Sequence, residues 1–434
     1  MGTIIPTKIL GFDGQVIKSV VFNEETGRVR FICDRDKRRR PVDHRTGRRG
    51  SINRLLRRTV VDVPMGGLPV EVEIEYAETF LSPGHVRVEA LSFVCPKVRV
   101  TKRFARLIAG MARHMPISTV ARHTGLPWNT VKAIECAHLA ETIPIPLPQT
   151  LTGIRYLGAD EVARAKGQSY FTLVYDLSPG SDYGRILWVK EGKEGDVLVQ
   201  FLDALLPECA AGIEAVALDM GPAYIAAVQK SLPNADIVFD RFHVMQMFSK
   251  VITDCRNAEF KAAKTLGDLT GQQMIKGSLW LLLSNHNTLN ETDLERLKRL
   301  LAENQPLATL YTLKEQLQRL WQPNSTPLTM AARLDDWCGV ADAAKIGGLN
   351  RFVKTLRAHR TGICAYADHP ITTSRLEAGN VSIALLRRRA RGFRDMEYFK
   401  LKIFQLNTDD TPSFLYPYMR SASMKTGNSS VGKQ

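Results

Sequence analysis

The fold class follows from three short apolar runs: IRYLGAD at residues 154–160, YFTLVYD at 170–176 and RILWVK at 185–190. Apolar runs of this length, bounded by turn residues, are typical of buried strands. Glycine, proline and serine lie in the gaps between the runs, so the connections are turns. We therefore expect three consecutive strands that form an antiparallel meander.

The stretch that follows alternates between helical and extended patterns. Helices are predicted at 196–206 and 223–232, and strands at 215–219 and 236–240. Because a strand–helix–strand connection returns the chain to the same end of a sheet, these strands are expected to pair in parallel. The order β-β-β-α-β-α-β over residues 151–243 predicts an α/β domain with a ribonuclease-H-like fold.

Three prolines within residues 142–150 indicate a stiff linker and a domain boundary. The other expected segments are a β-rich head at 1–100, a helical segment at 101–141, an all-helical insertion at 244–365, closing helices at 366–407 and a disordered polar tail at 408–434.

The head is expected to contain short strands. A hairpin joins Val16–Phe22 to Arg28–Cys33, and Val70–Tyr76 alternates apolar with acidic residues, as a strand with one wet face does. The arginine-rich stretch between these strands is predicted to be too polar to bury.

The net charge is +15, and two windows account for all of it. Residues 28–58 contain 13 Lys and Arg against 3 Asp and Glu, a surplus of ten; residues 385–402 contain 7 against 2, a surplus of five. Concentrated positive charge indicates a polyanionic partner, most often nucleic acid. In the first window, Arg38, Arg39 and Arg40 are candidate phosphate contacts.

The sequence predicts a cytoplasmic protein without a membrane partner. No apolar run approaches the roughly 18–20 residues that span a bilayer, and the N-terminus lacks a signal-peptide pattern. The seven cysteines are odd in number and never form a C-x-x-C pair, which fits a reducing compartment.

Residues 117–134 have a helix-turn-helix pattern. Ala121 is small where two helices must touch, Gly125 permits the turn, and Pro127 suits the first turn of the second helix. The apolar positions that hold the helices together are Leu126, Val131 and Ile134. The exposed face of the second helix would then offer Trp128, Asn129 and Lys132 to DNA. A generic helical hairpin is the alternative.

Two strands are predicted to end in a carboxylate, Asp160 and Asp219. Carboxylates on neighbouring buried strands repel each other, and a divalent cation relieves the repulsion. Oxygen ligands of this kind select Mg²⁺ or Mn²⁺. A third acid would complete a two-metal site for phosphoryl transfer.

Glu377 is the third candidate. A helix that begins near Ser374 places Glu377 in its first turn and Asn380 on the same face. The arginines that follow can bind phosphates: Arg387, Arg388, Arg391 and Arg394. The alternative is a capping box in which Glu377 only closes the helix start with Ser374.

These motifs resemble the DDE transposases of bacterial insertion sequences. The resemblance rests on the strands that end in Asp160-Glu161 and Asp219-Met220-Gly-Pro-Ala-Tyr224, on Asp240-Arg-Phe-His243, on Glu377-Ala-Gly-Asn380 and on Ala390-Arg-Gly-Phe393-Arg. It runs from about residue 15 to 407. The intervals of 59 and 158 residues between the three acids suit a helical insertion before the glutamate.

The resemblance assigns roles to these residues. It implies that Asp160, Asp219 and Glu377 bind catalytic Mg²⁺ or Mn²⁺, and that Asp240, His243 and Asn380 support them. For Asp240 and His243 the alternative is structural: a plain helix-start aspartate and a core histidine. The chain also departs from the family: Gly221 replaces an aromatic residue after the second aspartate.

The head departs further. Relatives have a C-x-x-C pair that binds zinc, whereas the zinc ligands available here are Cys33, His44 and Cys95, with Asp36 where the second cysteine would be. A closed zinc site needs four well-placed ligands, so weak or absent zinc is expected.

The resemblance implies a nucleoid-associated transposase that binds the terminal inverted repeats of its element, cleaves the strand ends and joins them to target DNA. It also implies a homodimer on paired ends. Two alternatives remain: a domesticated DNA-binding regulator without catalysis, and a nuclease of the same fold that cuts without joining.

Overall fold

The computed structural model describes residues 10–42, 49–82, 85–89, 91–165, 167, 169–180, 184–322 and 325–408. His44 and the tail beyond Thr408 lie outside the described residues. The chain forms two compact units. One is Met1–Pro144 together with Arg389–Gln434, and the other is Ile145–Arg388. The C-terminal helix therefore belongs with the N-terminal unit, although the sequence grouped it with the helix of Glu377.

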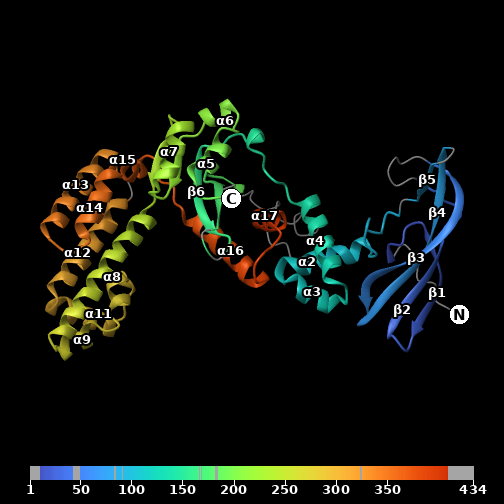
Figure 1. Cartoon of the computed structure of the whole chain (residues 1–434), viewed down its shortest axis with the longest axis horizontal. Helices are drawn as coiled ribbons and strands as arrows, with labels where there is room; N and C mark the ends of the chain where they lie inside the picture. Colours follow the sequence, from blue (N-terminus) through green and yellow to red (C-terminus); the bar gives the residue numbers. More distant parts are fainter. Residues whose placement is uncertain are drawn as a thin grey trace, which may run out of the picture. The chain divides into compact units, whose positions relative to one another are not determined.

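The head is one mixed sheet, shown in blue in Figure 1. Its strands are β1 (Gln15–Asn23), β2 (Arg28–Arg35), β3 (Ser51–Met65), β4 (Leu68–Ser82) and β5 (His85–Val88). The order is β1-β2-β4-β3, with β5 paired to β4. The predicted hairpin is confirmed as the antiparallel pair β1–β2. Alternate residues of β4, among them Val72 and Ile74, are buried in a core with Phe12 and Phe31.

The described arginines of the arginine-rich stretch stay mostly exposed, as predicted, except for the buried Arg35. Six arginines of the 28–58 window nevertheless lie in strands. They lie on β2 and β3, opposite the acidic face of β4. The ion pairs join Arg28 and Arg30 to Glu71, Arg35 to Glu89, Arg54 to Glu78, and Arg57 to Glu75 and Asp34. Most of these acids lie beyond residue 58, so the charge count of the window missed them. Cross-strand pairing neutralises much of the local surplus.

The helical part of this unit contains α2 (Lys102–His114), α3 (Ile117–Thr124), α4 (Trp128–Thr142) and α17 (Met396–Phe404). Helices α3 and α4 form the predicted helix-turn-helix. Gly125 ends α3 with φ of 69°, a left-handed conformation that favours glycine. Val131 and Ile134 are the predicted core positions of α4, and both are buried. Helix α17 packs against α4, and the buried Lys402 ammonium donates to Glu135 Oε1 at 2.8 Å.

The second unit contains a five-stranded sheet. Its strands are β6 (Tyr156–Ala163), β7 (Tyr170–Asp176), β8 (Arg185–Glu191), β9 (Ala215–Leu218) and β10 (Asp236–Phe239), in the order β10-β9-β6-β7-β8. The pairs β6–β7 and β7–β8 are antiparallel, whereas β9 pairs in parallel with both β6 and β10. The predicted meander and the two predicted parallel strands are confirmed.

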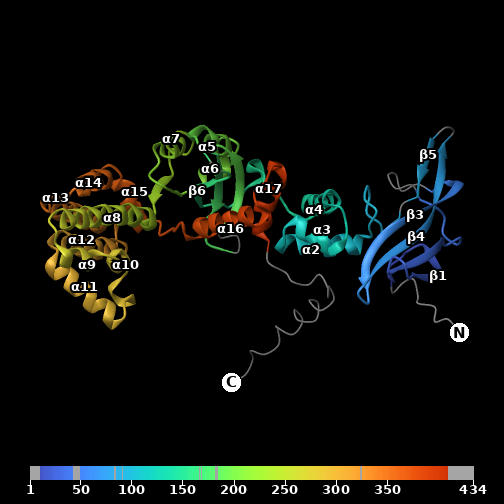
Figure 2. The ribbon, with the colours of Figure 1, turned by 60° about the horizontal axis from the view of Figure 1, so that its bottom comes forward.

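Helices cover both faces of this sheet. On one face lie α5 (Gly195–Leu202), α6 (Pro207–Ala211) and α7 (Pro222–Ser231); on the other lies α16 (Ser374–Ala390), as Figure 2 shows. Helix α16 approaches the sheet closely. A Cβ atom on Gly158 of β6 would lie 2.9 Å from Leu376, and one on Gly379 would lie 2.6 Å from the Tyr175 hydroxyl.

Between β10 and α16 the described residues form only helices and their connections, as predicted. The α-helices are α8 (Arg241–Thr265), α9 (Leu269–Ile275), α10 (Leu279–Leu283), α11 (Glu291–Glu303), α12 (Gln305–Gln318), α13 (Pro327–Ala343), α14 (Leu349–Ala358) and α15 (Arg360–Cys364). They share one core, in which Phe248, Trp337 and Phe352 pack ring against ring. In the part of the chain that the structure describes, none of the helices has both the length and the apolar character of a membrane span.

Candidate active site

Three aspartates lie next to one another near one edge of the second sheet, Asp160 within β6 and Asp219 and Asp240 directly after β9 and β10. Gly158 of β6 pairs with Ala217 of β9, so continuing the same register by two residues sets Asp160 beside Asp219. Likewise Phe239 of β10 pairs with Leu218, so the next residue, Asp240, follows beside Asp219. The 59-residue interval between the first two acids is thus the register of a parallel pair.

Asp160 is not the last residue of its strand, contrary to the prediction. Strand β6 continues to Ala163 because the antiparallel partner β7 extends alongside it, with Asp160 opposite Leu173. Only the parallel partner β9 has ended at this level. The carboxylate therefore projects from a paired strand, on the face that α16 covers.

Two donors fix the Asp160 carboxylate. The backbone N–H of Glu161 donates to Oδ1 and Asn380 Nδ2 donates to Oδ2, each at 2.7 Å. Burial raises the pKa of Asp160, and the charge of Asp219 adds to the increase, although His243 and both donors oppose it. The site therefore supplies too little positive charge to offset the burial of Asp160.

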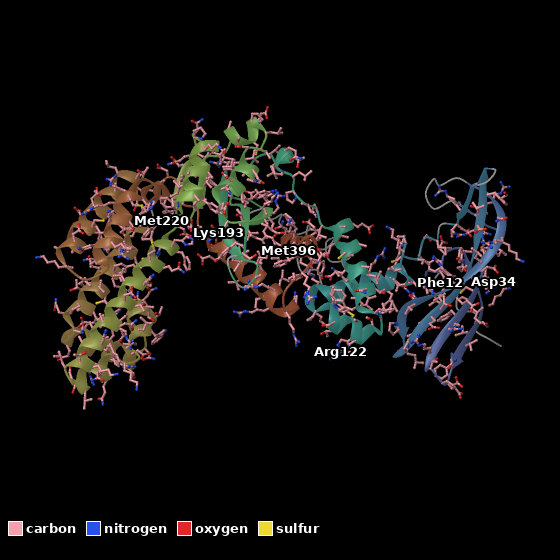
Figure 3. The ribbon with its side chains drawn as sticks, in the orientation of Figure 1. Phe12, Asp34, Arg122, Lys193, Met220 and Met396 are labelled. Carbon is pink, nitrogen blue, oxygen red and sulfur yellow. The ribbon has the colours of Figure 1, made fainter. Side chains whose placement is uncertain are left out.

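Asp219 is exposed at the end of β9. Its Oδ1 accepts from the N–H of Gly221 at 2.9 Å, and a Cβ atom on residue 221 would lie 2.8 Å from this oxygen. Glycine at this position therefore allows the carboxylate to fold back over the start of α7. Met220, labelled in Figure 3, packs against the core of the helical segment.

Glu377 lies in the first turn of α16, as predicted. Its Oε1 accepts from the Thr373 hydroxyl at 3.4 Å, and the Ser374 hydroxyl pairs instead with Thr372 at 2.9 Å. Among these contacts there is no Ser374–Glu377 capping box. Burial raises the pKa of Glu377, and Asp240 and Asp160 raise it further, whereas His243 lowers it.

Asp240 joins two segments that are far apart in the sequence. Its Oδ1 accepts from Phe242 N at 3.2 Å and caps α8, while Oδ2 accepts from Thr373 N at 2.6 Å and from the Thr373 hydroxyl. The buried Asp240 thus holds the residue that precedes α16. His243, half-buried on α8, is near enough to Asp160 and Glu377 to lower the pKa of both.

The acids interact electrostatically, but they do not form a closed cluster. In the residues that the structure describes, no group of three His, Cys, Asp or Glu side chains is arranged to hold a metal ion. Asp160 and Asp219 each accept from a donor of their own, whereas Glu377 shares the Thr373 hydroxyl with Asp240. Their oxygen-only chemistry and their mutual repulsion nevertheless fit a hard divalent cation.

Comparisons with known proteins agree with this architecture. A family model described as "Transposase" matches residues 157–403, and one described as "Helix-turn-helix domain of transposase family ISL3" matches residues 89–135. The chain belongs to the ISL3 family of transposases. The transposase for insertion sequence element IS1001 of Bordetella parapertussis is 33% identical over 396 residues, which cover 91% of this chain and 95% of the relative. The transposase for IS1557 of Mycobacterium tuberculosis is 26% identical over 313 residues, 68% of this chain and 69% of the relative.

The predicted DNA-reading residues of this transposase differ in their surroundings. Trp128 and Asn129 are exposed at the start of α4. Lys132 was expected on the same exposed face, but its ammonium group forms an ion pair with Asp395 Oδ2 at 2.7 Å. Lys132 is only partly exposed, because Asp395, which caps α17 and follows 263 residues later, covers this side of α4.

The arginines that follow Glu377 also differ in their exposure and in their partners. Arg388, Arg391 and Arg394 are exposed. The Arg387 guanidinium instead donates to the backbone oxygen of Ala163 and so ties α16 to the end of β6. Arg389, which the sequence did not single out, donates to the backbone oxygens of Arg113 and His114 at the end of α2, at 2.9 and 3.0 Å.

In the head, Arg38 pairs with Asp36 and Arg39 with Asp13, and Arg38, Arg39 and Arg40 are all exposed. Exposed pairs of this kind are weak and leave the guanidinium groups available to phosphate. Cys33 is fully buried in the sheet core, where burial raises the pKa of its thiol to about 12. Cys95 is half-buried, and weak or absent zinc in the head stays a prediction.

Sequence reasoning missed Thr373, Gly379 and Asp395. Thr373 holds Asp240, Gly379 lets α16 approach Tyr175, and Asp395 binds Lys132. Gly379 had a signal, since glycine inside a helix usually marks a close approach. The other two have none, because their partners lie more than a hundred residues away.

Proposed function

We propose that this transposase binds the terminal inverted repeats of an insertion sequence, cleaves the strands at its ends and joins the 3′-hydroxyl groups to target DNA. Its catalytic residues are Asp160, Asp219 and Glu377. The observation that carries the proposal is the gathering of carboxylates at one sheet edge, where burial and mutual repulsion raise the pKa of Asp160 and Glu377.

The same proposal includes the fold. Residues 151–243 are a ribonuclease-H-like core, the helices between 244 and 365 are an insertion into it, and α16 closes it. The strand order β10-β9-β6-β7-β8, with an antiparallel meander followed by parallel strands, supports this assignment. The insertion is anchored at both ends by Asp240 and Thr373, which bond to each other across it.

Asp160, Asp219 and Glu377 would hold Mg²⁺ or Mn²⁺, which activates the attacking oxygen and stabilises the leaving oxygen of the phosphodiester. Asn380 orients the Asp160 carboxylate through its 2.7 Å hydrogen bond. Asp240 fixes Thr373, whose hydroxyl lies between the carboxylates of Asp240 and Glu377. His243 lies near enough to Asp160 and Glu377 to lower the pKa of both, which opposes the effect of their burial.

DNA is proposed to lie on both units. Trp128 and Asn129 contact bases from α4, with Asn129 suited to adenine. Phosphates are contacted by exposed arginines: Arg38, Arg39, Arg40, Arg388, Arg391 and Arg394. The transposase would act as a homodimer on paired ends, in the cytoplasm and in association with the nucleoid.

The test is cleavage and joining of end-labelled duplexes that carry the DNA flanking the gene. Asp160→Asn, Asp219→Asn and Glu377→Gln should each abolish both steps in Mg²⁺ while duplex binding stays within about twofold of wild type. Glu161→Gln is the matched control, because successive side chains of a strand face opposite sides and Glu161 therefore points away from α16. It should cleave at a near wild-type rate.

Three outcomes would contradict the proposal. Robust cleavage by Glu377→Gln would remove that residue and leave Asp240 as the third acid. Cleavage without joining by the wild-type chain would identify a nuclease. Binding without any cleavage in Mg²⁺ or Mn²⁺ would identify a regulator.

A further inference from the structure

Lys132 of the helix-turn-helix has a protein carboxylate as its partner. Its Nζ lies 2.7 Å from Asp395 Oδ2, and its side chain keeps 24% of its exposure against 44% for Asp395. The same ammonium group lies over the rings of Trp128 and Tyr398, at 5.7 and 5.5 Å from their centroids. One helical turn of α4 thus combines an exposed aromatic ring, an exposed amide at Asn129 and a cation that is already paired.

Asp395 is held in place by its own helix. It is the N-cap of α17, where Oδ1 accepts from Tyr398 N at 3.1 Å while Oδ2 binds Lys132. The hydrogen bond from Lys132 is the largest cause that keeps the pKa of Asp395 below its usual range, so the carboxylate is charged at neutral pH. The buried ion pair Lys402–Glu135 holds α17 against α4 and so keeps Asp395 close to Lys132.

The neighbours of Asp395 are basic. Arg394 precedes it directly, and Arg391 lies in the same turn between α16 and α17, with φ of 56°. Both side chains are exposed. The Lys132–Asp395 pair therefore joins the start of α4 to this basic turn, so that Asp395 lies against the helix expected to read DNA.

We propose that the start of α4 and this basic turn bind the sugar-phosphate backbone of duplex DNA, and that Asp395 is a built-in competitor that a DNA phosphate must displace from Lys132. The inference rests on the proposed function, because it assumes that α4 faces DNA. A partly exposed ion pair is weak enough to exchange, and a phosphate offers Lys132 the same charge-assisted contact that the carboxylate does. The carboxylate therefore lowers affinity for any duplex without removing the contact.

The experiment compares full-length Asp395→Asn with wild type. Asparagine caps a helix as well as aspartate does, so the change removes the charge and keeps the N-cap. On a short duplex of mixed sequence, Asp395→Asn should bind about two- to fivefold more tightly at low salt, the range that an exposed ion pair accounts for. The slope of log K against log salt should become steeper by up to about 0.9, because in wild type the displaced carboxylate takes up a cation that offsets one released from the DNA.

The matched control is Glu397→Gln. Glu397 lies in the same first turn of α17, is 83% exposed and pairs with Lys400 rather than with α4. Its substitution removes the same charge and should leave the affinity and the salt slope unchanged. Asp395→Ser, which also retains a capping hydroxyl, should repeat the result of Asp395→Asn and so exclude a folding artefact.

Equal tightening by Glu397→Gln would overturn the inference, since general repulsion would then explain the effect. Tightening by Asp395→Asn that persists in a Lys132→Gln background would overturn it too. If wild type binds the duplex and Asp395→Asn binds it identically, only this inference fails. If wild type shows no salt-dependent binding of duplex DNA, the proposed function fails with it.

Discussion

At Glu377, burial, Asp240 and Asp160 all raise the pKa of the side chain above its ordinary value. A carboxyl whose pKa is higher in the folded state than in the unfolded state holds its proton more tightly when folded. Its contribution to stability is therefore present below the unfolded pKa and is lost as the pH rises through the folded pKa. At neutral pH without a cation, the charged side chain opposes folding.

We therefore predict that Glu377→Gln stabilises the metal-free protein at pH 7.5, by about 0.5–2 kcal/mol, the usual gain when a functional residue under strain is replaced. The difference should vanish below about pH 4, where wild-type Glu377 is protonated. Thermal melting in chelator at both pH values measures it. Asp335→Asn is the control of opposite sign, because the side-chain hydrogen bond from Arg360 lowers the pKa of Asp335. A Glu377→Gln protein that melts below wild type at pH 7.5 would contradict the prediction.

At the scale of elements, the position of α16 depends on two glycines. Gly158 leaves room for Leu376, and Gly379 leaves room for the hydroxyl of the buried Tyr175. Helix α16 can therefore lie directly on β6 and β7, which brings Asn380 to the Asp160 carboxylate. Any side chain at residue 379 pushes the helix away from the sheet and moves Glu377 with it.

Gly379→Ala should therefore lower the cleavage rate about tenfold to a hundredfold, since displacements near 1 Å cost this much in a positioned site. Duplex binding should be unchanged. Gly339→Ala is the matched control: Gly339 lies within α13, nothing lies within 4 Å of its added Cβ, and alanine favours a helix by about 1 kcal/mol. It should cleave normally and melt higher. Normal cleavage by Gly379→Ala would show that α16 tolerates the shift.

At the scale of the molecule, the N-terminal unit is completed by the end of the chain. Lys402 and Glu135 are both buried, and Lys402 also donates to the backbone oxygen of Ala112 on α2. The Tyr398 hydroxyl donates to the other oxygen of Glu135. One buried polar network therefore holds α2, α4 and α17 together, and the helix-turn-helix is not formed by residues 101–141 alone.

Lys402→Met should lower the free energy of unfolding of this unit by about 3–5 kcal/mol, because it leaves Glu135 buried without its counter-charge. Adding Glu135→Gln should restore much of the loss, since no unpaired charge then remains. Chemical unfolding followed by Trp128 fluorescence measures both. Lys400→Met, which breaks only the surface pair with Glu397, should change stability by less than about 0.5 kcal/mol. Equal effects of the two lysine substitutions would show that the buried network stabilises the unit no more than a surface ion pair does.

Local patterns in the sequence were sufficient for much of the fold and for part of the site. The strand predicted at 170–176 is β7, the helix predicted to begin near Ser374 is α16, and Gly125 ends α3 as expected. Each of these depends on side-chain periodicity or on a backbone conformation that neighbouring residues specify. The same patterns placed Glu377 in a first helical turn, and the family resemblance was confirmed by comparison.

Only the tertiary structure decided which charges meet. The sequence could not show that the glutamates of β4 neutralise the arginines of β2 and β3, or that Asp395 binds Lys132. It placed Asp160 at a strand end, whereas β6 continues to Ala163 because β7 pairs alongside it. The physical reason is common to all three. Secondary structure is set by residues within a few positions of one another, while ion pairs and strand ends depend on which distant segments pack together.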